Sequence, residues 1–101
     1  MTTSATEFRP RAALTLGVTT TDDALVVDLD DGRTLSVPLA WYPRLLHATA
    51  AERAEWRLIG EGEGIHWPSI DEDISVEALI AGRPSAESDK SLRDWLSRRS
   101  G

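Results

Sequence analysis

The sequence contains no cysteine, and it has no hydrophobic run of the length that a membrane span requires. Without cysteine, neither disulfides nor thiolate metal sites can stabilise the fold. The N-terminal residues also lack the basic start and the apolar stretch of a secretory signal peptide. We therefore expect a cytoplasmic protein that does not enter a membrane.

Positive charge is scarce over most of the chain. Residues 1–82 carry six basic and fourteen acidic side chains, a net charge of −8, whereas residues 83–101 carry five basic and three acidic ones, a net charge of +2. An acidic body repels the phosphate backbone, which argues against direct nucleic-acid binding and fits a basic protein partner. Solubility alone also explains such a charge.

No nucleophile, phosphate-binding loop or set of metal ligands is recognisable. His66 stands among carboxylates, and imidazole with carboxylates can form a metal or acid/base site, but the spacing is not diagnostic. Its place on a strand beside Trp67 favours a half-exposed side chain or one bonded to a loop carboxylate. We predict no enzyme activity, no catalytic residue, no metal and no cofactor. An enzyme that uses His66 with Asp71 or Asp73 is the least favoured alternative.

The length of 101 residues suits one domain with one small core. We divide the chain into a flexible N-terminal lead-in at residues 1–12, a single α+β domain at residues 13–82, and a linker with a short amphipathic tail at residues 83–101. Phe8 is expected to anchor the end of the lead-in.

Period-two apolar patterns predict five strands. Three of them, at residues 14–18, 24–29 and 33–37, come first, and the last two are joined by a tight turn at Asp31-Gly32. A second hairpin pairs residues 56–58 with residues 65–67 around Gly60, Gly62 and Gly64, which are expected to supply the positive φ angles of the reversal.

Helix signals separate and follow these strands. Residues 39–48 predict a short helix, and Thr49 with Glu52 has the form of a capping box for a second one. Residues 69–73 are interpreted as an acidic loop. Ser75 is expected to cap a helix at Val76–Ala81 that ends at Gly82.

The predicted fold is α+β, in the order β-β-β-α-β-β-α plus a C-terminal helix. An antiparallel sheet of about five strands is covered on one face by two or three short helices. Indole rings bury large apolar areas, so the tryptophans are expected in or near the layer between sheet and helices. The predicted core residues are Trp41, Leu45, Trp56, Leu58, Ile65, Trp67 and Leu79.

The segment Gly64-Ile65-His66-Trp67-Pro68, followed by Asp71-Glu72-Asp73-Ile74-Ser75, is distinctive, as are Trp41-Tyr42-Pro43-Arg44-Leu45 and Trp56-Arg57-Leu58. With these motifs, residues 14–82 resemble the bacterial domain-of-unknown-function family 2442 (DUF2442). The resemblance implies a small α+β domain, sometimes fused to a helix-turn-helix domain and often encoded beside a second small protein in what look like toxin–antitoxin pairs. It implies no particular enzyme activity. The 19 residues after Gly82 are too few for a helix-turn-helix domain.

Two surfaces are candidates for binding a partner. The acids of residues 71–73 beside His66 and Trp67 can dock an arginine-rich patch, although electrostatic stabilisation of the following helix also explains them. The tail has an apolar stripe that packs either on its own body or on another chain. The predicted partner-binding residues are His66, Asp71, Glu72, Asp73, Leu92, Trp95 and Leu96.

The sequence therefore favours a non-catalytic protein–protein interaction domain. We expect an antitoxin-like partner of a small basic toxin from a neighbouring gene, and the composition also allows a homo-oligomer. The alternative is an accessory or sensory domain of a transcription regulator.

Overall fold

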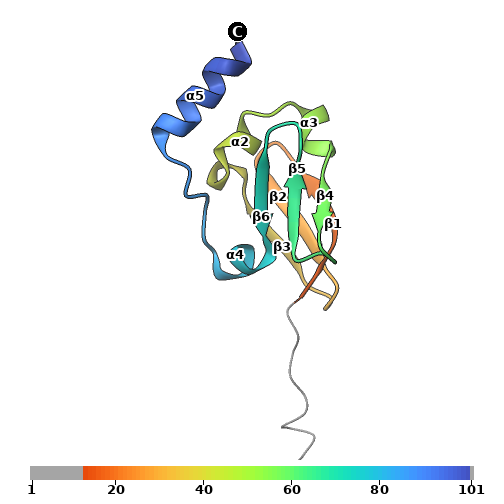
Figure 1. Ribbon diagram of the computed structural model, residues 1–101. Helices are drawn as coiled ribbons and strands as arrows, with labels where there is room; N and C mark the ends of the chain where they lie inside the picture. Colours follow the sequence, from red (N-terminus) through yellow and green to blue (C-terminus); the bar gives the residue numbers. More distant parts are fainter. Residues whose placement is uncertain (1–12, 101) are drawn as a thin grey trace, which may run out of the picture.

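The computed structural model describes residues 13–100. The predicted flexible lead-in, with Phe8 as its anchor, lies outside this range. Along the chain, three strands are followed by a 3-10 helix and two short α-helices, then by three further strands and two α-helices (Figure 1).

The first sheet is an antiparallel meander in the order β1-β2-β3. Its strands are β1 (Thr15–Thr20), β2 (Ala24–Leu29) and β3 (Thr34–Pro38). The alternation expected from the sequence is present, since Leu25, Val27 and Leu29 are buried on one face of β2. The turn between β2 and β3 differs from the predicted two-residue form, because only Gly32 in it has a positive φ.

The second sheet has the order β4-β5-β6 and is also antiparallel. Its strands are β4 (Arg57–Ile59), β5 (Gly64–Trp67) and β6 (Glu72–Ser75). The predicted hairpin of the first two strands is confirmed, and Gly60 and Gly62 supply its positive φ angles, whereas Gly64 lies in β5. The prediction of an acidic loop through residue 73 is wrong, because Glu72 and Asp73 belong to β6.

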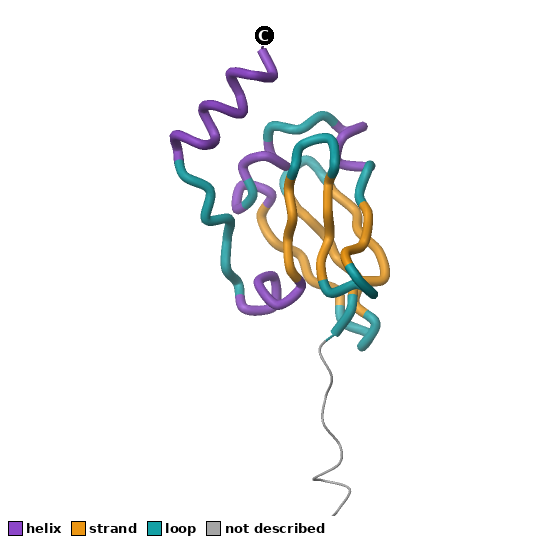
Figure 2. The backbone as a smooth tube through the Cα atoms, in the orientation of Figure 1, coloured by secondary structure: helices purple, strands orange, loops and turns teal. Residues whose placement is uncertain are grey.

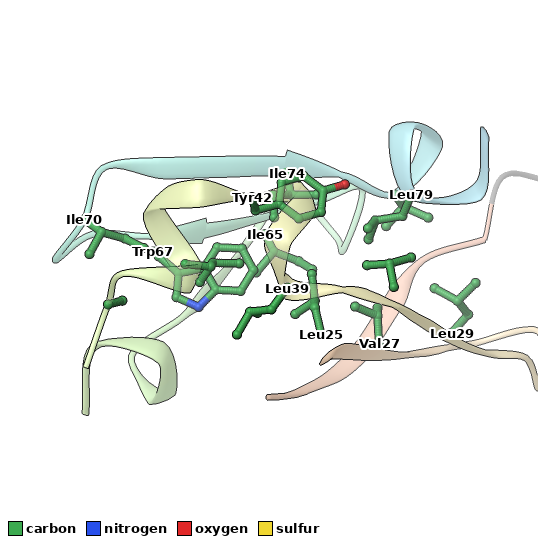
Figure 3. Packing of buried hydrophobic residues seen from close by; sticks show 14 of the residues in the cluster. Leu25, Val27, Leu29, Leu39, Tyr42, Ile65, Trp67, Ile70, Ile74 and Leu79 are labelled. Atoms are coloured by element: carbon green, nitrogen blue, oxygen red, sulfur yellow. The ribbon is translucent and has the colours of Figure 1, made fainter. Parts of the chain in front are cut away.

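The two sheets lie face to face and enclose the core between them (Figure 3). The single five-stranded sheet covered by helices is therefore wrong, because a second sheet takes the place of the helices over the first. Trp67 is fully buried in this layer, and its indole N–H donates to the carbonyl of Arg53 at 3.1 Å. The amide of Thr15 donates to the carbonyl of Gly62 at 2.9 Å, which joins β1 to the β4–β5 turn.

The helices lie at the ends and along one side of the sheet pair (Figures 1 and 2). The predicted single helix over residues 39–48 is interrupted at Tyr42, whose φ and ψ are −127° and 87°. Pro43 explains the break, since the ring of a proline disfavours helical angles at the residue before it. The separate helices are η1 (Leu39–Trp41), α2 (Pro43–Leu46), α3 (Ala50–Ala54), α4 (Val76–Ala81) and α5 (Asp89–Ser100).

The predicted helix caps are present. Thr49 and Glu52 form the reciprocal capping box of α3. The hydroxyl of Ser75 accepts from the amide of Ala78, and Gly82 ends α4 with a φ of 73°.

Most of the predicted core residues lie in the core. Trp41 and Trp56 are partly buried and pack against it, whereas Leu45, Ile65, Trp67 and Leu79 are buried. Leu58 is the exception at 39% exposed, because β4 is a three-residue edge strand whose side chains all remain exposed. None of the helices between residues 13 and 100 combines the length and the apolar character needed to cross a bilayer.

Candidate interaction surface

The predicted partner-binding residues around β6 do not form one cluster, because a strand sends successive side chains to opposite faces. His66 and Asp73 are cross-strand neighbours on the face of the second sheet that points away from the core. Glu72 pairs with Trp67 in the register and lies on the other side of β6. Asp71 sits in the turn before β6 with a φ of 53°.

The outward face of the second sheet is not covered by any helix among the described residues (Figures 1 and 2). Arg57, His66 and Asp73 stand in register across its three strands. The imidazole Nδ1 of His66 contacts Oδ1 of Asp73, so this carboxylate positions the ring. Within residues 13–100, no three acidic, histidine or cysteine side chains are arranged to hold a metal ion.

Arg44 ties the β5–β6 turn to the C-terminal segment. Its Nη1 donates to the carbonyl of Ile70 at 3.0 Å, while its Nε and Nη2 donate to the carboxylate of Glu87 at 2.8–3.1 Å. A forked guanidinium is suited to such a two-point contact with a carboxylate. The Arg44 guanidinium lowers the pKa of the Glu87 carboxyl, because its hydrogen bonds favour the charged form.

The same arginine contributes to the attachment of α5. The guanidinium carbons of Arg44 and Arg99 lie 5.2 Å and 4.6 Å from the centroid of the Trp95 ring. Arg99 is held in turn by two hydrogen bonds to the Glu52 carboxylate, at 2.8 Å and 2.9 Å. Trp95 is 6% exposed, so of the two packing alternatives for the tail, the structure shows packing on its own body.

The rest of the tail stripe follows Trp95. Leu92 and Leu96 are partly buried and pack against the core cluster. The apolar side of α5 is thus used inside the chain, and the proposed contact with a partner has to be sought elsewhere.

Glu72 is a carboxyl group whose pKa lies well above its ordinary value. Burial raises its pKa to about 7, and the nearby charge of Glu87 adds to this effect, while Arg44 opposes it. The carboxylates of Asp73 and Asp71 raise the pKa further. Among residues 13–100, no side chain or backbone amide donates a hydrogen bond to the carboxylate of Glu72, so its negative charge is poorly compensated in the free protein.

Glu72 lines a groove of about 510 Å³ beside β6, between that strand and the segment of residues 83–86. Tyr42, Ile74 and Ala78 contribute aromatic and apolar surface to it, and the Tyr42 hydroxyl donates to the carbonyl of Arg83 at 3.2 Å. Burial raises the pKa of Tyr42, and the charge of Glu72 raises it further, so the hydroxyl remains protonated. The charged side chains on the groove are Glu63, Glu72, Asp73 and Arg83.

Sequence reasoning missed the residues that organise this surface. Arg44 is part of a sequence motif, but nothing in the sequence indicates that Glu87, 43 positions later, is its partner. Tyr42 belongs to the motif Trp41-Tyr42-Pro43-Arg44-Leu45, but that motif did not show that its hydroxyl bonds the carbonyl of Arg83. Glu52 was recognised as a cap, but its second role as the partner of Arg99 was not.

Comparison with known proteins places this architecture in a family. A sequence profile described as "Protein of unknown function (DUF2442)" matches residues 16–85. The chain belongs to the DUF2442 family. A search of curated proteins gives no significant match.

Two solved structures share the fold of this DUF2442 domain. A protein of unknown function from Rhodospirillum rubrum is similar with a TM-score of 0.66 and 24% identity, over 76% of this chain and 95% of the other. An uncharacterized protein from Chromobacterium violaceum is similar with a TM-score of 0.62 and 22% identity, over 80% of this chain and 74% of the other. At these identities the similarity establishes the fold alone.

Proposed function

We propose that this DUF2442 domain is a non-catalytic protein–protein interaction domain of the cytoplasm, and that it acts as the antitoxin-like partner of a small basic protein encoded by a neighbouring gene. The observation that carries the proposal is the acidic groove beside β6, next to a sheet face without a helix over it. Opposite charge on two surfaces accelerates their encounter and selects the partner.

The chemistry of the described surface supports binding better than catalysis. His66 and Asp73 form a pair, but the hydroxyl nearest along β6, that of Ser75, already accepts the amide of Ala78 as a helix cap. With that hydroxyl engaged as a helix cap, the His–Asp pair acts as a positioned polar contact. Such a contact suits the polar rim of an interface.

The test is co-expression of the full chain with the product of the adjacent gene. We expect the two proteins to purify as a complex at micromolar concentration, and the chain to restore growth when the neighbour alone inhibits it. The Asp22→Asn variant removes one negative charge from the β1–β2 turn of the other sheet. It is the control, and we expect it still to form the complex and to restore growth. No complex together with no rescue of growth contradicts the proposal.

A second candidate function is an accessory or sensory domain of a transcription regulator. It is favoured by the basic residues of α5, of which Arg93 and Arg98 are exposed. In this case the chain binds a helix-turn-helix protein or promoter DNA through its tail. A mobility-shift assay at physiological salt separates the two, since the interaction domain proposed first gives no shift of DNA by itself.

A further inference from the structure

The outer edge of β6 carries backbone groups that the described chain does not use. β6 is an edge strand, and the amide of Val76, directly after it, donates to the carbonyl of Glu63 at 2.9 Å. Bonded and non-bonded pairs alternate along an antiparallel ladder. Since Glu63 and Val76 form one bonded pair, the next bonded pairs along the ladder are Ile65–Ile74 and Trp67–Glu72. Asp73, between them, directs its N–H and C=O away from β5.

An open groove lies at this edge. The groove of about 510 Å³ separates β6 from residues 83–86. Within residues 13–100, no backbone hydrogen bond joins that segment to β6. Instead, the amide of Ser85 donates to the carbonyl of Trp41 at 2.9 Å, and the amide of Arg83 donates to that of Ala78 at 2.9 Å. An unpaired edge strand facing an open groove is the geometry in which proteins accept an added strand.

The charges of the groove specify the occupant. The acidic residues that line it are Glu63, Glu72 and Asp73, against Arg83 as its basic residue. Glu72 lies on the core side of β6, whereas the Asp73 carboxylate contacts His66 on the outer side of the strand. The guanidinium of Arg83 lies 3.7 Å from the carboxylate of Glu77, which partly neutralises the positive charge of Arg83. Ile59 and Pro84, which also line the groove and are exposed, offer packing for the aliphatic stem of a long cationic side chain.

We propose that this groove receives an extended, arginine- or lysine-bearing segment of a partner protein, which pairs with the free edge of β6. Side chains of an added strand alternate between its faces, so one cationic residue meets Glu72 and its neighbour in sequence meets Asp73. The partner segment therefore carries two adjacent basic residues in a β-prone context. This inference rests on the proposed function in one respect, namely that the domain works by binding a protein.

The ionisation of Glu72 makes this contact dependent on pH. The groups that act on Glu72 are Glu87, Asp71 and Asp73, which favour its protonated form, and Arg44, which favours its charged form. A bound cation also favours the charged form, so a proton and the partner compete for Glu72. Binding is consequently weaker at pH 6 and stronger at pH 8, on either side of a pKa of about 7.

The probe is a fluorescent hexapeptide, Thr-Val-Arg-Arg-Val-Thr, titrated into the full chain at low ionic strength. We expect binding at pH 8, with a shift of the backbone amide resonance of Asp73. Glu72→Gln is expected to weaken it about tenfold, the loss typical of one hydrogen bond to a charged group, and to remove the difference between pH 6 and pH 8. Asp22→Asn, which removes one charge from the other sheet, is the matched control and leaves the affinity unchanged.

Two N-methylated peptides test the backbone pairing. In one peptide every second backbone amide is methylated, and in the other peptide the remaining amides are methylated. Both peptides keep the same charge. One of the two sets is expected to abolish binding, because only the amides that face β6 are needed. Equal binding of both peptides, or an unchanged affinity of Glu72→Gln, overturns the proposal.

Failure of the groove proposal can be distinguished from failure of the proposed interaction function. If the neighbouring gene product forms a complex but no peptide binds, and Glu72→Gln leaves the complex intact, the groove assignment is wrong and the interaction function stands. If the peptide binds as expected but the neighbouring product does not, the groove assignment stands and the partner is a different basic protein.

Discussion

Trp67 and Trp95 are both buried, yet by different means. Trp67 lies between the two sheets among aliphatic side chains, and one neutral hydrogen bond satisfies its indole N–H (Figure 3). Trp95 is covered by the guanidinium groups of Arg44 and Arg99, each of which is paired with a carboxylate. The central body is thus stabilised by apolar burial, and the docking of α5 depends in large part on charge.

The difference predicts different responses to solution conditions. Burial of apolar surface depends weakly on salt and on pH, whereas partly exposed ion pairs are screened by salt. The Glu52 carboxyl has its pKa lowered to about 2, first by the hydrogen bonds from Arg99 and then by the amide of Thr49. Its contribution is present above the unfolded pKa of 4.5 and is lost as the pH falls toward 2. We therefore expect acid to release α5 before it unfolds the body.

The largest effect is expected from Trp67→Ala. Removing this ring leaves a cavity between the sheets and lowers the free energy of unfolding by about 3–5 kcal/mol. Urea denaturation followed by circular dichroism measures the loss, with the partly buried Trp56→Ala as a milder control. A loss below that of Trp56→Ala contradicts the assignment of Trp67 to the centre of the core.

Gly62→Ala is expected to disturb the contact between the sheets. A Cβ at this position comes within 2.8 Å of the carbonyl oxygen and 2.9 Å of the amide nitrogen of Thr15. Gly32→Ala is the matched control, because Gly32 also has a positive φ but no atom lies within 4 Å of its added Cβ. We expect Gly62→Ala to destabilise the protein by about 2 kcal/mol more than the control does. Equal losses in urea denaturation indicate that only backbone strain matters.

Trp95→Ala is expected to detach α5 while the body stays folded. The loss of apolar contact and of the two cation–π contacts is about 2 kcal/mol, which is less than the loss at Trp67. Amide hydrogen exchange should show protection falling across α5 and remaining unchanged in β2 and β5. Arg98→Ala, on an exposed position of the same helix, should alter neither. Equal loss of protection in α5 and in the strands shows that the helix belongs to the cooperative core.

The smallest effect concerns Glu72. Because burial raises the pKa of this acid from 4.5 to about 7, the folded state holds a proton that the unfolded state releases in that range. The free energy of unfolding therefore falls as the pH rises from about 4.5 to 7. Glu72→Gln removes this dependence, so the variant should match the parent at pH 4 and exceed it by about 1 kcal/mol at pH 8. A parent and variant with parallel stability profiles contradict the raised pKa.

The sequence was sufficient for the elements with strong local signals. The alternation in β2, the glycine-rich reversal between β4 and β5, and the caps at Thr49 and Ser75 each depend on contacts between near neighbours. β6 escaped detection because its four residues are Glu-Asp-Ile-Ser, in which Ile74 alone is apolar. Its strand conformation comes from pairing with β5 rather than from its own preferences.

The arrangement of the elements depended on distant contacts that no local pattern encodes. Two half-buried hairpins have the same alternation whether they form one sheet or two facing ones, so the sequence did not distinguish these architectures. The apolar stripe of Leu92, Trp95 and Leu96 indicated that α5 packs against another surface, but it did not indicate which surface. Arg44 and Glu87 form part of that packing site only after the chain has folded.

The short connection from Gly82 to Ser88 gives the docking of α5 a kinetic consequence. A helix released from its seat remains tethered a few nanometres away, at an effective concentration in the range of about 1 mM for short flexible links. Rebinding is then intramolecular and independent of protein concentration. A free peptide that mimics α5 displaces the helix only when its concentration or its affinity exceeds this effective concentration. The binding site of Trp95 is therefore protected from weakly binding competitors in the cell.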